Sequence, residues 1–283
     1  MKTVKTISEQ IEILQKRGLI INDEEKAYSV LQNINYYSLT GYLFQFKRDK
    51  CYLEGTSFDL IYNLYLFDNE LRTLLLSQVS NAEEMLKTRI SYHIAILHPE
   101  NPLIYLDKEY FKNKSDFKKL EKAFQKSVQD NQSIPFVRHH INHYDAQFPI
   151  WVAIELFTLG NLKYLYKNIP SKDRKVISRD LNLSPPVLDS WIDSLRILRN
   201  HLAHNMRLYN TTFPKIPKFE KHHSVIIKTN RIFIFFQLLK YISQTVENWN
   251  ITLIKLKDLM ECYSQYISNQ SLGLPDNWFY LLK

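Results

Sequence analysis

Glycine is scarce in this 283-residue sequence, which contains only 5 glycines. Folds that depend on glycine-rich turns, such as dinucleotide-binding α/β units, are therefore disfavoured. Cysteine is also scarce, and Cys51 and Cys262 cannot form a disulfide framework, so a reducing cytoplasm is the expected location. The most apolar stretch, residues 232–242, is far too short to span a bilayer, and the polar N-terminus does not resemble a signal peptide. No membrane partner is expected.

The chain is instead rich in hydrophobic, aromatic and basic residues. Hydrophobic residues make up 45% and charged residues 23%, a balance that allows a globular protein to bury a substantial core. The net charge of +8 and the isoelectric point near 9.2 favour a polyanionic partner, with nucleic acid before membrane. Charge alone is weak support, because many basic proteins bind nothing anionic.

Apolar residues repeat with helical spacing from end to end, so the sequence predicts an all-α protein. The longest predicted helix runs from Phe58 towards Leu97, after a cap at Thr56 or Ser57. A small hairpin is predicted around Cys51. The charged residues of the long helix are expected to be mostly solvated and paired one turn apart; they are Asp68, Glu70, Arg72, Glu83, Glu84, Lys87 and Arg89.

We expect a single domain over residues 1–283, with an N-terminal helical part over about 1–130 and a core over about 150–247. Two C-terminal helices are predicted over residues 225–246 and 252–267.

A dense aromatic cluster lies between Asn35 and Leu43 and includes Tyr36, Tyr37 and Tyr42. Aromatic side chains most often pack in the core, so we predict a corner of the core here. Stacking of RNA bases on these tyrosines is the alternative interpretation.

Lysines interleave with aromatic residues between Lys108 and Lys126. This pattern predicts a phosphate-contacting helix face with the aromatic side chains on the opposite side. A merely solvated helix face is the alternative. The lysines that we select as candidates for RNA binding are Lys112, Lys118, Lys119 and Lys122.

Three histidines lie close together between Arg138 and Asp145, and His139 and His143 are one helical turn apart. Zinc binding is disfavoured, because no glutamate follows the first histidine as in the metalloprotease helix and no cysteine is near. We predict no metal and no cofactor.

An amphipathic helix is predicted to start at Ser184-Pro185-Pro186, a cap residue followed by prolines in the first turn. Near its end stands the segment Arg199-Asn200-His201-Leu202-Ala203-His204. Its apolar stripe consists of Leu188, Trp191, Leu195, Leu198 and Leu202.

At about 100° per residue, Asn200 and His204 lie one turn apart on the face opposite this stripe. Arg199 flanks the stripe, about 140° around the helix from His204. Within one helix the two side chains therefore do not point at a common atom. Two antiparallel copies related by a twofold axis would bring an arginine and a histidine from each side into one cleft.

Arginine and histidine together suit phosphoryl-transfer chemistry without a metal. Histidine exchanges protons near neutral pH, so His204 can take the proton of an RNA 2′-hydroxyl or protonate the leaving 5′-oxygen. Arg199 can hold the phosphate through two N–H donors, and Asn200 can orient His204 or donate to a phosphate oxygen. Arg196 and Arg207 flank the motif and are further candidates for RNA contacts.

Spacing alone favours a structural helix with surface residues, because Arg138 and His143 repeat the same five-residue offset. The wider sequence carries more information. The segment from Arg199 to Asn210 resembles the Arg-Asn-x-x-x-His signature of HEPN-domain ribonucleases and, more closely, the abortive-infection (Abi) phage-resistance proteins of bacteria. His201 departs from that pattern, since relatives often have a small or apolar residue there. Further stretches are similar to the Abi family: residues 10–46, 67–72 and 157–162.

The resemblance implies a HEPN-like helical bundle with additional N- and C-terminal helices. It also implies metal-independent endoribonuclease activity, homodimeric active sites and a toxin's role in phage defence. The catalytic residues it implies are Arg199, Asn200 and His204. RNA is the implied partner, as substrate and, as in some relatives, as a small noncoding RNA. A non-catalytic RNA-binding module on the same fold and a helical protein-interaction subunit are the alternatives.

Overall fold

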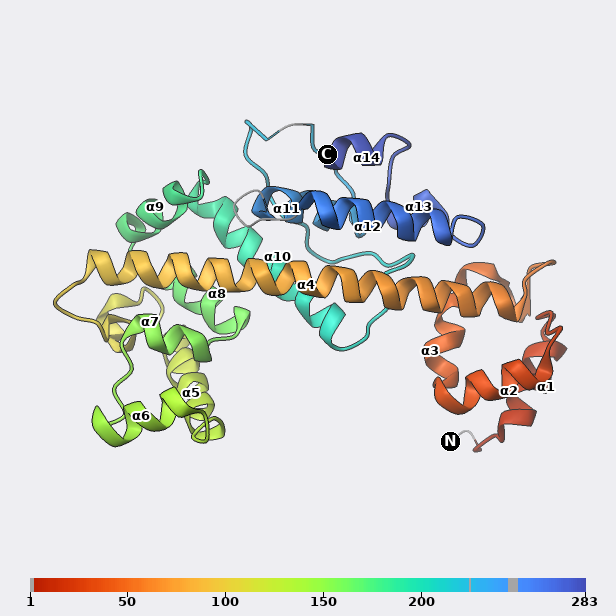
Figure 1. The fold of residues 1–283 in the computed structure, drawn as a ribbon, viewed down its shortest axis with the longest axis horizontal. Coiled ribbons are helices and arrows are strands. Elements are labelled where there is room, and N and C mark those ends of the chain that lie inside the picture. Colours follow the sequence, from red (N-terminus) through yellow and green to blue (C-terminus); the bar gives the residue numbers. More distant parts are fainter. Residues whose placement is uncertain (1–2, 224, 244–248) are drawn as a thin grey trace.

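A single long helix organises the fold. The computed structural model describes residues 3–223, 225–243 and 249–283. Its helix α4 (Phe58–Leu97) has 40 residues and is about 60 Å long (Figure 1). The Ser57 hydroxyl caps the first turn by accepting a hydrogen bond from the Leu60 amide at 3.1 Å. The predicted long helix is confirmed at both ends.

The remaining elements surround α4. They are α1 (Ile7–Lys16), α2 (Glu24–Asn33), α3 (Tyr36–Thr40), η1 (Gly41–Phe46), β1 (Lys47–Arg48), β2 (Cys51–Tyr52), η2 (Ile104–Leu106), η3 (Lys108–Tyr110), α5 (Lys114–Asp130), α6 (Pro135–His143), α7 (Ile150–Ala153), η4 (Ile154–Leu156), α8 (Leu159–Asn168), α9 (Ser171–Asp180), α10 (Pro185–Ala203), α11 (Phe233–Ser243), α12 (Trp249–Cys262), α13 (Asn269–Leu272) and α14 (Trp278–Leu282), where η denotes a 3₁₀ helix. In the described ranges the only sheet is the antiparallel pair β1–β2, with Arg48 opposite Cys51. The all-α class and the hairpin around Cys51 are both confirmed.

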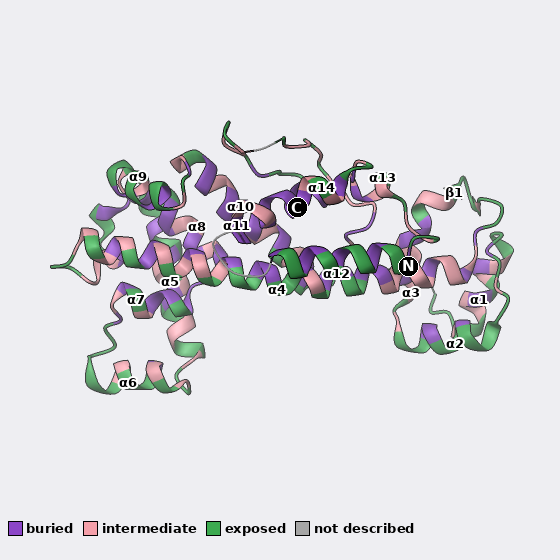
Figure 2. Cartoon of the chain, turned by 45° about the horizontal axis from the view of Figure 1, so that its top comes forward, coloured by how far each residue is buried: buried purple, intermediate pink, exposed green. Residues whose placement is uncertain are grey.

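The helices form groups along α4. Figure 1 shows α1, α2 and α3 at one end of α4 and α5 to α9 at the other, with α10 crossing its middle and α11 and α12 running alongside. α10 packs against α4 and α8, and α11 and α12 pack against α4. Buried residues therefore follow α4 along its length, while α6 projects outward and buries only Val137 (Figure 2).

The N-terminal group is tied to the start of α4 by backbone hydrogen bonds. The Ile20 amide donates to the Thr56 carbonyl at 2.9 Å, and the Phe58 amide donates to the Ile20 carbonyl at 2.8 Å. The Tyr52 amide of the hairpin donates to the Arg17 carbonyl at 2.7 Å. These bonds hold α1 and the hairpin against the first turn of α4.

The first C-terminal helix starts later than predicted. α11 begins at Phe233 rather than at residue 225, and the predicted end at residue 246, like the predicted core boundary near 247, lies outside the described residues. The side chain of Gln237 explains the late start: it accepts from the Ile227 amide at 2.9 Å and donates to the Ile227 carbonyl at 3.0 Å. Ile227 therefore makes its hydrogen bonds beside α11 and not within it.

No helix in the described ranges combines the length and hydropathy needed to cross a bilayer.

Candidate functional site

α10 carries the signature segment, and its apolar stripe is buried as predicted. Pro185 and Pro186 occupy the first turn after Ser184. The side chains of Leu188, Trp191, Leu195, Leu198 and Leu202 are all buried. This burial fixes how α10 is rotated against α4 and α8, and so decides which of its residues reach the surface.

The helix ends inside the signature. Ala203 is its last residue, His204 is the C-cap, and Asn205 has a positive φ of 51°. Asparagine tolerates this left-handed conformation better than most residues, so Asn205 is well suited to turn the chain. The His204 amide still donates to the Asn200 carbonyl at 3.1 Å. The predicted one-turn relation of Asn200 and His204 is confirmed, but His204 stands at the helix end and not within the helix.

Arg199 and His204 are both exposed, and Asn200 is partly exposed. Across the described residues, neither the Arg199 guanidinium nor the His204 imidazole takes part in a hydrogen bond or an ion pair. Both groups are therefore available to a ligand.

His201, by contrast, is held in place. Its Nδ1 donates to the Ile197 carbonyl at 3.0 Å, and its ring lies 4.9 Å from that of Phe213. These contacts fix the orientation of the His201 imidazole.

Two pockets flank the signature. Arg199 and Ala203 line one of about 520 Å³, together with acidic residues that include Glu83, Glu84 and Glu155. The segment after the helix lines the second, of about 490 Å³, through Asn205 and Arg207. His204 lies in sequence between Ala203, which lines the first pocket, and Asn205, which lines the second.

A buried carboxylate anchors the chain just after the signature. The Asp68 side chain of α4 is fully buried and accepts hydrogen bonds from the backbone amides of Leu208 at 2.9 Å and Tyr209 at 2.8 Å. It also accepts from the Tyr42 hydroxyl at 2.7 Å and from Arg72 at 2.9 Å. Burial raises the pKa of Asp68, whereas these four donors favour the charged form. One side chain thus joins η1, α4 and the segment that follows His204.

The prediction that Asp68 and Arg72 are solvated is therefore wrong, since Arg72 is only 5% exposed. The two residues are one turn apart on the side of α4 that faces Tyr42 and the 207–209 segment. The sequence of an Asp–Arg pair at this spacing does not distinguish a solvent-exposed helix face from a buried one. The adjoining apolar residues Phe67 and Leu71 were the only local signal of burial.

Arg207 is partly buried and reinforces this anchor. Its guanidinium donates to the Gly41 carbonyl and lies 5.7 Å from the centre of the Tyr42 ring. As a candidate for RNA contacts it lines the second pocket, but its guanidinium already contacts the protein.

Arg196 is also engaged, in a cluster around Asp193. Its Nε and Nη2 atoms lie 3.0 and 2.8 Å from the Asp193 carboxylate, which Lys163 and Lys215 contact at 2.8 and 3.0 Å. Partial burial by itself raises the pKa of Asp193, but hydrogen bonds from the three cationic side chains outweigh it. The pKa therefore lies well below its ordinary value.

Asp193→Asn is expected to lower the free energy of unfolding at neutral pH by roughly 1.5–3 kcal/mol, because charged hydrogen bonds are lost. A folded-state pKa below the unfolded value stabilises the protein above about pH 4, and this contribution disappears as the pH falls through the folded pKa. The difference between wild type and variant should thus shrink in acid. Urea unfolding at pH 7 and pH 3 measures this difference in stability, with the exposed Asp276→Asn as control. A difference that does not change with pH would contradict the role of the Asp193 cluster in stability.

The lysine-rich segment folds as predicted. Phe117 and Phe124 are buried, whereas Lys118 and Lys122 are exposed on α5. Two of the candidate lysines contact the protein: Lys112 donates to the Ser171 hydroxyl at 2.8 Å and Lys119 to Asp116 at 3.2 Å. The structure separates the lysine face from the aromatic face, and RNA binding by it stays a prediction.

The histidines of α6 interact mainly with one another and with neighbouring rings. His139 and His143 have ring centres 4.9 Å apart, and His140 stacks on Phe148 at 5.2 Å. Among the residues that the structure describes, no group of three or more His, Cys, Asp or Glu side chains is placed to hold a metal ion.

These features define a class of protein. It is all-α, it carries an arginine–histidine signature at the exposed end of a helix whose apolar stripe is buried, and the segment after this signature is anchored to a long central helix. The family of Abi-like proteins matches residues 29–210, and the chain belongs to that family. The matched region contains Asp68 and the whole signature, and it suggests a role in abortive infection of phage-infected bacteria. No curated protein and no solved structure matches the chain.

Proposed function

We propose that the protein is a metal-independent endoribonuclease of HEPN type that acts as a toxin in abortive infection. One observation carries the proposal. Arg196, His201 and Arg207, which flank or interrupt the signature, are engaged with the protein, whereas the arginine and the terminal histidine of the signature are exposed and unengaged. A fold that engages the neighbouring arginines and imidazole and leaves these two groups free presents them to a ligand.

The chemistry follows from the two side chains. An imidazole takes the proton from the 2′-hydroxyl, whose oxygen then forms a bond to phosphorus while the bond from phosphorus to the 5′-oxygen breaks. The imidazolium that forms returns this proton, through solvent, to the leaving 5′-oxygen. Arg199 offsets the charge that builds on the phosphate oxygens. The products are a 2′,3′-cyclic phosphate and a 5′-hydroxyl.

A second copy of the chain completes the site. His204 lines neither of the pockets beside the signature, so one chain does not form a complete cleft around Arg199. The small side chain of Ala203 leaves room in the Arg199 pocket for an antiparallel partner helix, and the exposed Leu76 gives that helix an apolar surface to contact. We therefore propose a homodimer with one arginine and one histidine from different chains in each site.

Cleavage of RNA in the presence of EDTA tests the proposal. His204→Ala and Arg199→Ala should each reduce the rate by at least about 100-fold, since each removes a proton-transfer or charge-stabilising group. The chain offers a matched control, because Arg138 and His143 are an exposed pair with the same offset on α6. Arg138→Ala and His143→Ala should cleave like wild type.

Product ends distinguish the chemistry. A 2′,3′-cyclic phosphate in the wild-type reaction is the expected result. Equal cleavage by wild type and His204→Ala, or loss of activity on adding EDTA, would contradict the assignment. In cells, expression of wild type should be toxic and expression of His204→Ala should not.

A further inference from the structure

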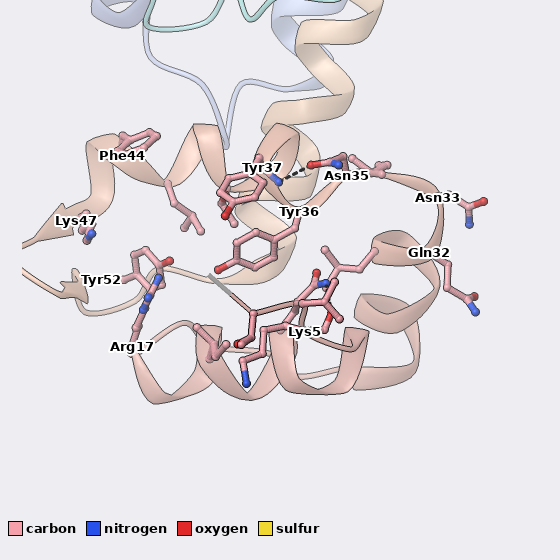
Figure 3. Close-up of a pocket in the computed structure, with 18 residues that line it drawn as sticks. Lys5, Arg17, Gln32, Asn33, Asn35, Tyr36, Tyr37, Phe44, Lys47 and Tyr52 are labelled. Atoms are coloured by element: carbon pink, nitrogen blue, oxygen red, sulfur yellow. Dashed lines mark hydrogen bonds between the residues drawn. The ribbon is translucent and has the colours of Figure 1, made fainter. Parts of the chain in front are cut away.

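A large pocket lies at the N-terminal end of the molecule, away from the signature helix. It measures about 1180 Å³ and lies between α1 and α2 on one side and α3, η1 and the hairpin on the other (Figure 3). Four aromatic side chains line it: Tyr36, Tyr37, Phe44 and Tyr52. Figure 3 shows the Tyr36 ring directed into the space above α1.

Two of these rings are largely exposed. Tyr37 is 70% exposed and Phe44, directly after the predicted aromatic cluster, is 72% exposed, whereas Leu39, Tyr42 and Leu43 are buried. The predicted corner of the core is therefore confirmed for part of the cluster and wrong for Tyr37. Exposed rings of this size beside a pocket offer flat apolar faces for stacking.

The pocket is also one-sided in charge. Among the described residues, the lining includes three cations, Lys5, Arg17 and Lys47, and no aspartate or glutamate. Lys5 is partly neutralised by its ion pair with Glu9 at 3.0 Å. The amide side chains of Gln32, Asn33 and Asn35 add hydrogen-bonding groups. In a nucleic acid, the cations can contact the phosphates, the amides can form hydrogen bonds with the base edges, and the aromatic rings can stack on the base planes.

Tyr37 and Phe44 also form part of the second pocket, the one lined by Asn205 and Arg207. The two pockets further share Asn33 and Asn35, and the second likewise has no carboxylate in its lining. The two pockets therefore adjoin at these side chains, and together they extend from Arg17, past the exposed rings, to the residue directly after His204. We name this the aromatic groove.

We propose that the aromatic groove binds single-stranded RNA and leads it to the signature. The inference rests on the proposed ribonuclease function for its ligand class. The rings stack on unpaired bases, which are accessible in a single strand and covered in a duplex. The first pocket alone exceeds the roughly 300–1,000 Å³ of small-molecule sites, so it suits a polymer better than a mononucleotide.

Binding measured without cleavage tests this inference. The full chain with His204→Ala serves as the parent, and a fluorescent single-stranded RNA of about 15 nucleotides is titrated by anisotropy. Adding Tyr37→Ala and Phe44→Ala together should raise Kd by about ten- to a hundredfold, the loss expected for one or two stacked bases. The melting temperature should stay near that of the parent, because both rings are largely exposed. Adding Tyr92→Ala and Tyr280→Ala, exposed tyrosines on α4 and α14, is the matched control and should not change Kd.

The dependence of RNA binding on salt concentration tests the role of the cationic residues. Arg17→Gln with Lys47→Gln should reduce the slope of log K against log salt by about 1.4, as expected for the loss of two phosphate contacts to a single strand. An unchanged Kd in the Tyr37→Ala/Phe44→Ala protein would overturn the inference, as would equal affinity for duplex RNA or for AMP.

Failure of the two proposals can be told apart. RNA binding that depends on the groove, with no cleavage by the wild-type chain, would leave the groove standing and refute the ribonuclease. Cleavage by Tyr37→Ala/Phe44→Ala with wild-type kcat/KM would refute the groove and leave the ribonuclease standing.

Discussion

Asp68→Ala is expected to be among the most destabilising single substitutions, lowering the free energy of unfolding by roughly 3–5 kcal/mol. The substitution leaves the nearly buried Arg72 guanidinium without its counter-charge. It also leaves the amides of Leu208 and Tyr209 without an acceptor, and each buried unpaired group costs about 1–3 kcal/mol. Urea unfolding followed by circular dichroism measures the loss.

A matched control comes from an exposed pair with the same one-turn spacing. Glu12 and Lys16 on α1 are in contact at 3.1 Å but largely solvated, so Glu12→Ala should change stability by less than about 1 kcal/mol. Asp68→Asn keeps the shape of the side chain and one acceptor oxygen, and it should fall between wild type and Asp68→Ala. A loss below about 1 kcal/mol in Asp68→Ala would contradict the anchoring role.

The regular parts of the fold could be predicted because they depend on local signals. α4 begins after Ser57 and ends at Leu97, where the periodic apolar pattern stops and Pro99 follows. The stripe of α10 is buried because its spacing of three and four residues places it on one helix face. Both features are decided within a few turns of the chain.

Tertiary partners decide the features that were missed. Asp68 is buried because Tyr42 and the 207–209 segment, far away in sequence, supply its hydrogen bonds. Residues 225–230 are not helical because Gln237 binds the backbone of Ile227. Tyr37 is exposed and Tyr42 buried, although both belong to one aromatic cluster. Residue type and spacing do not distinguish these cases, since the deciding contact lies in another element.

The candidate site shows the same division. The position of His204 one turn after Asn200 follows from helix geometry, but the helix end between Ala203 and Asn205 does not follow from the apolar pattern. The anchor that holds this end, Asp68, lies more than a hundred residues earlier in the chain. The resemblance identified the signature residues, whereas the groups that position them required the structure.

Mixing two inactive variants is expected to restore RNA cleavage. If each active site takes Arg199 from one chain and His204 from the other, a heterodimer of Arg199→Ala and His204→Ala chains keeps one intact site and loses the other. Random exchange of equal amounts makes half of the dimers heterodimers, so the mixture should recover about a quarter of wild-type activity, while each variant alone stays inactive. Cleavage assayed in EDTA, after refolding the mixture from denaturant, measures the recovery.

This result separates two arrangements that single variants do not. A site built within one chain predicts no recovery at any mixing ratio, because every chain lacks one of the two groups. A composite site predicts recovery that rises and falls with the heterodimer fraction, with its maximum at equal amounts. A mixture of His204→Ala with the double variant Arg199→Ala/His204→Ala is the control. Its dimers lack His204 in both chains, so this mixture should remain inactive. Full inactivity of the first mixture, with dimers present by light scattering, would indicate a site built within one chain and would refute the composite cleft.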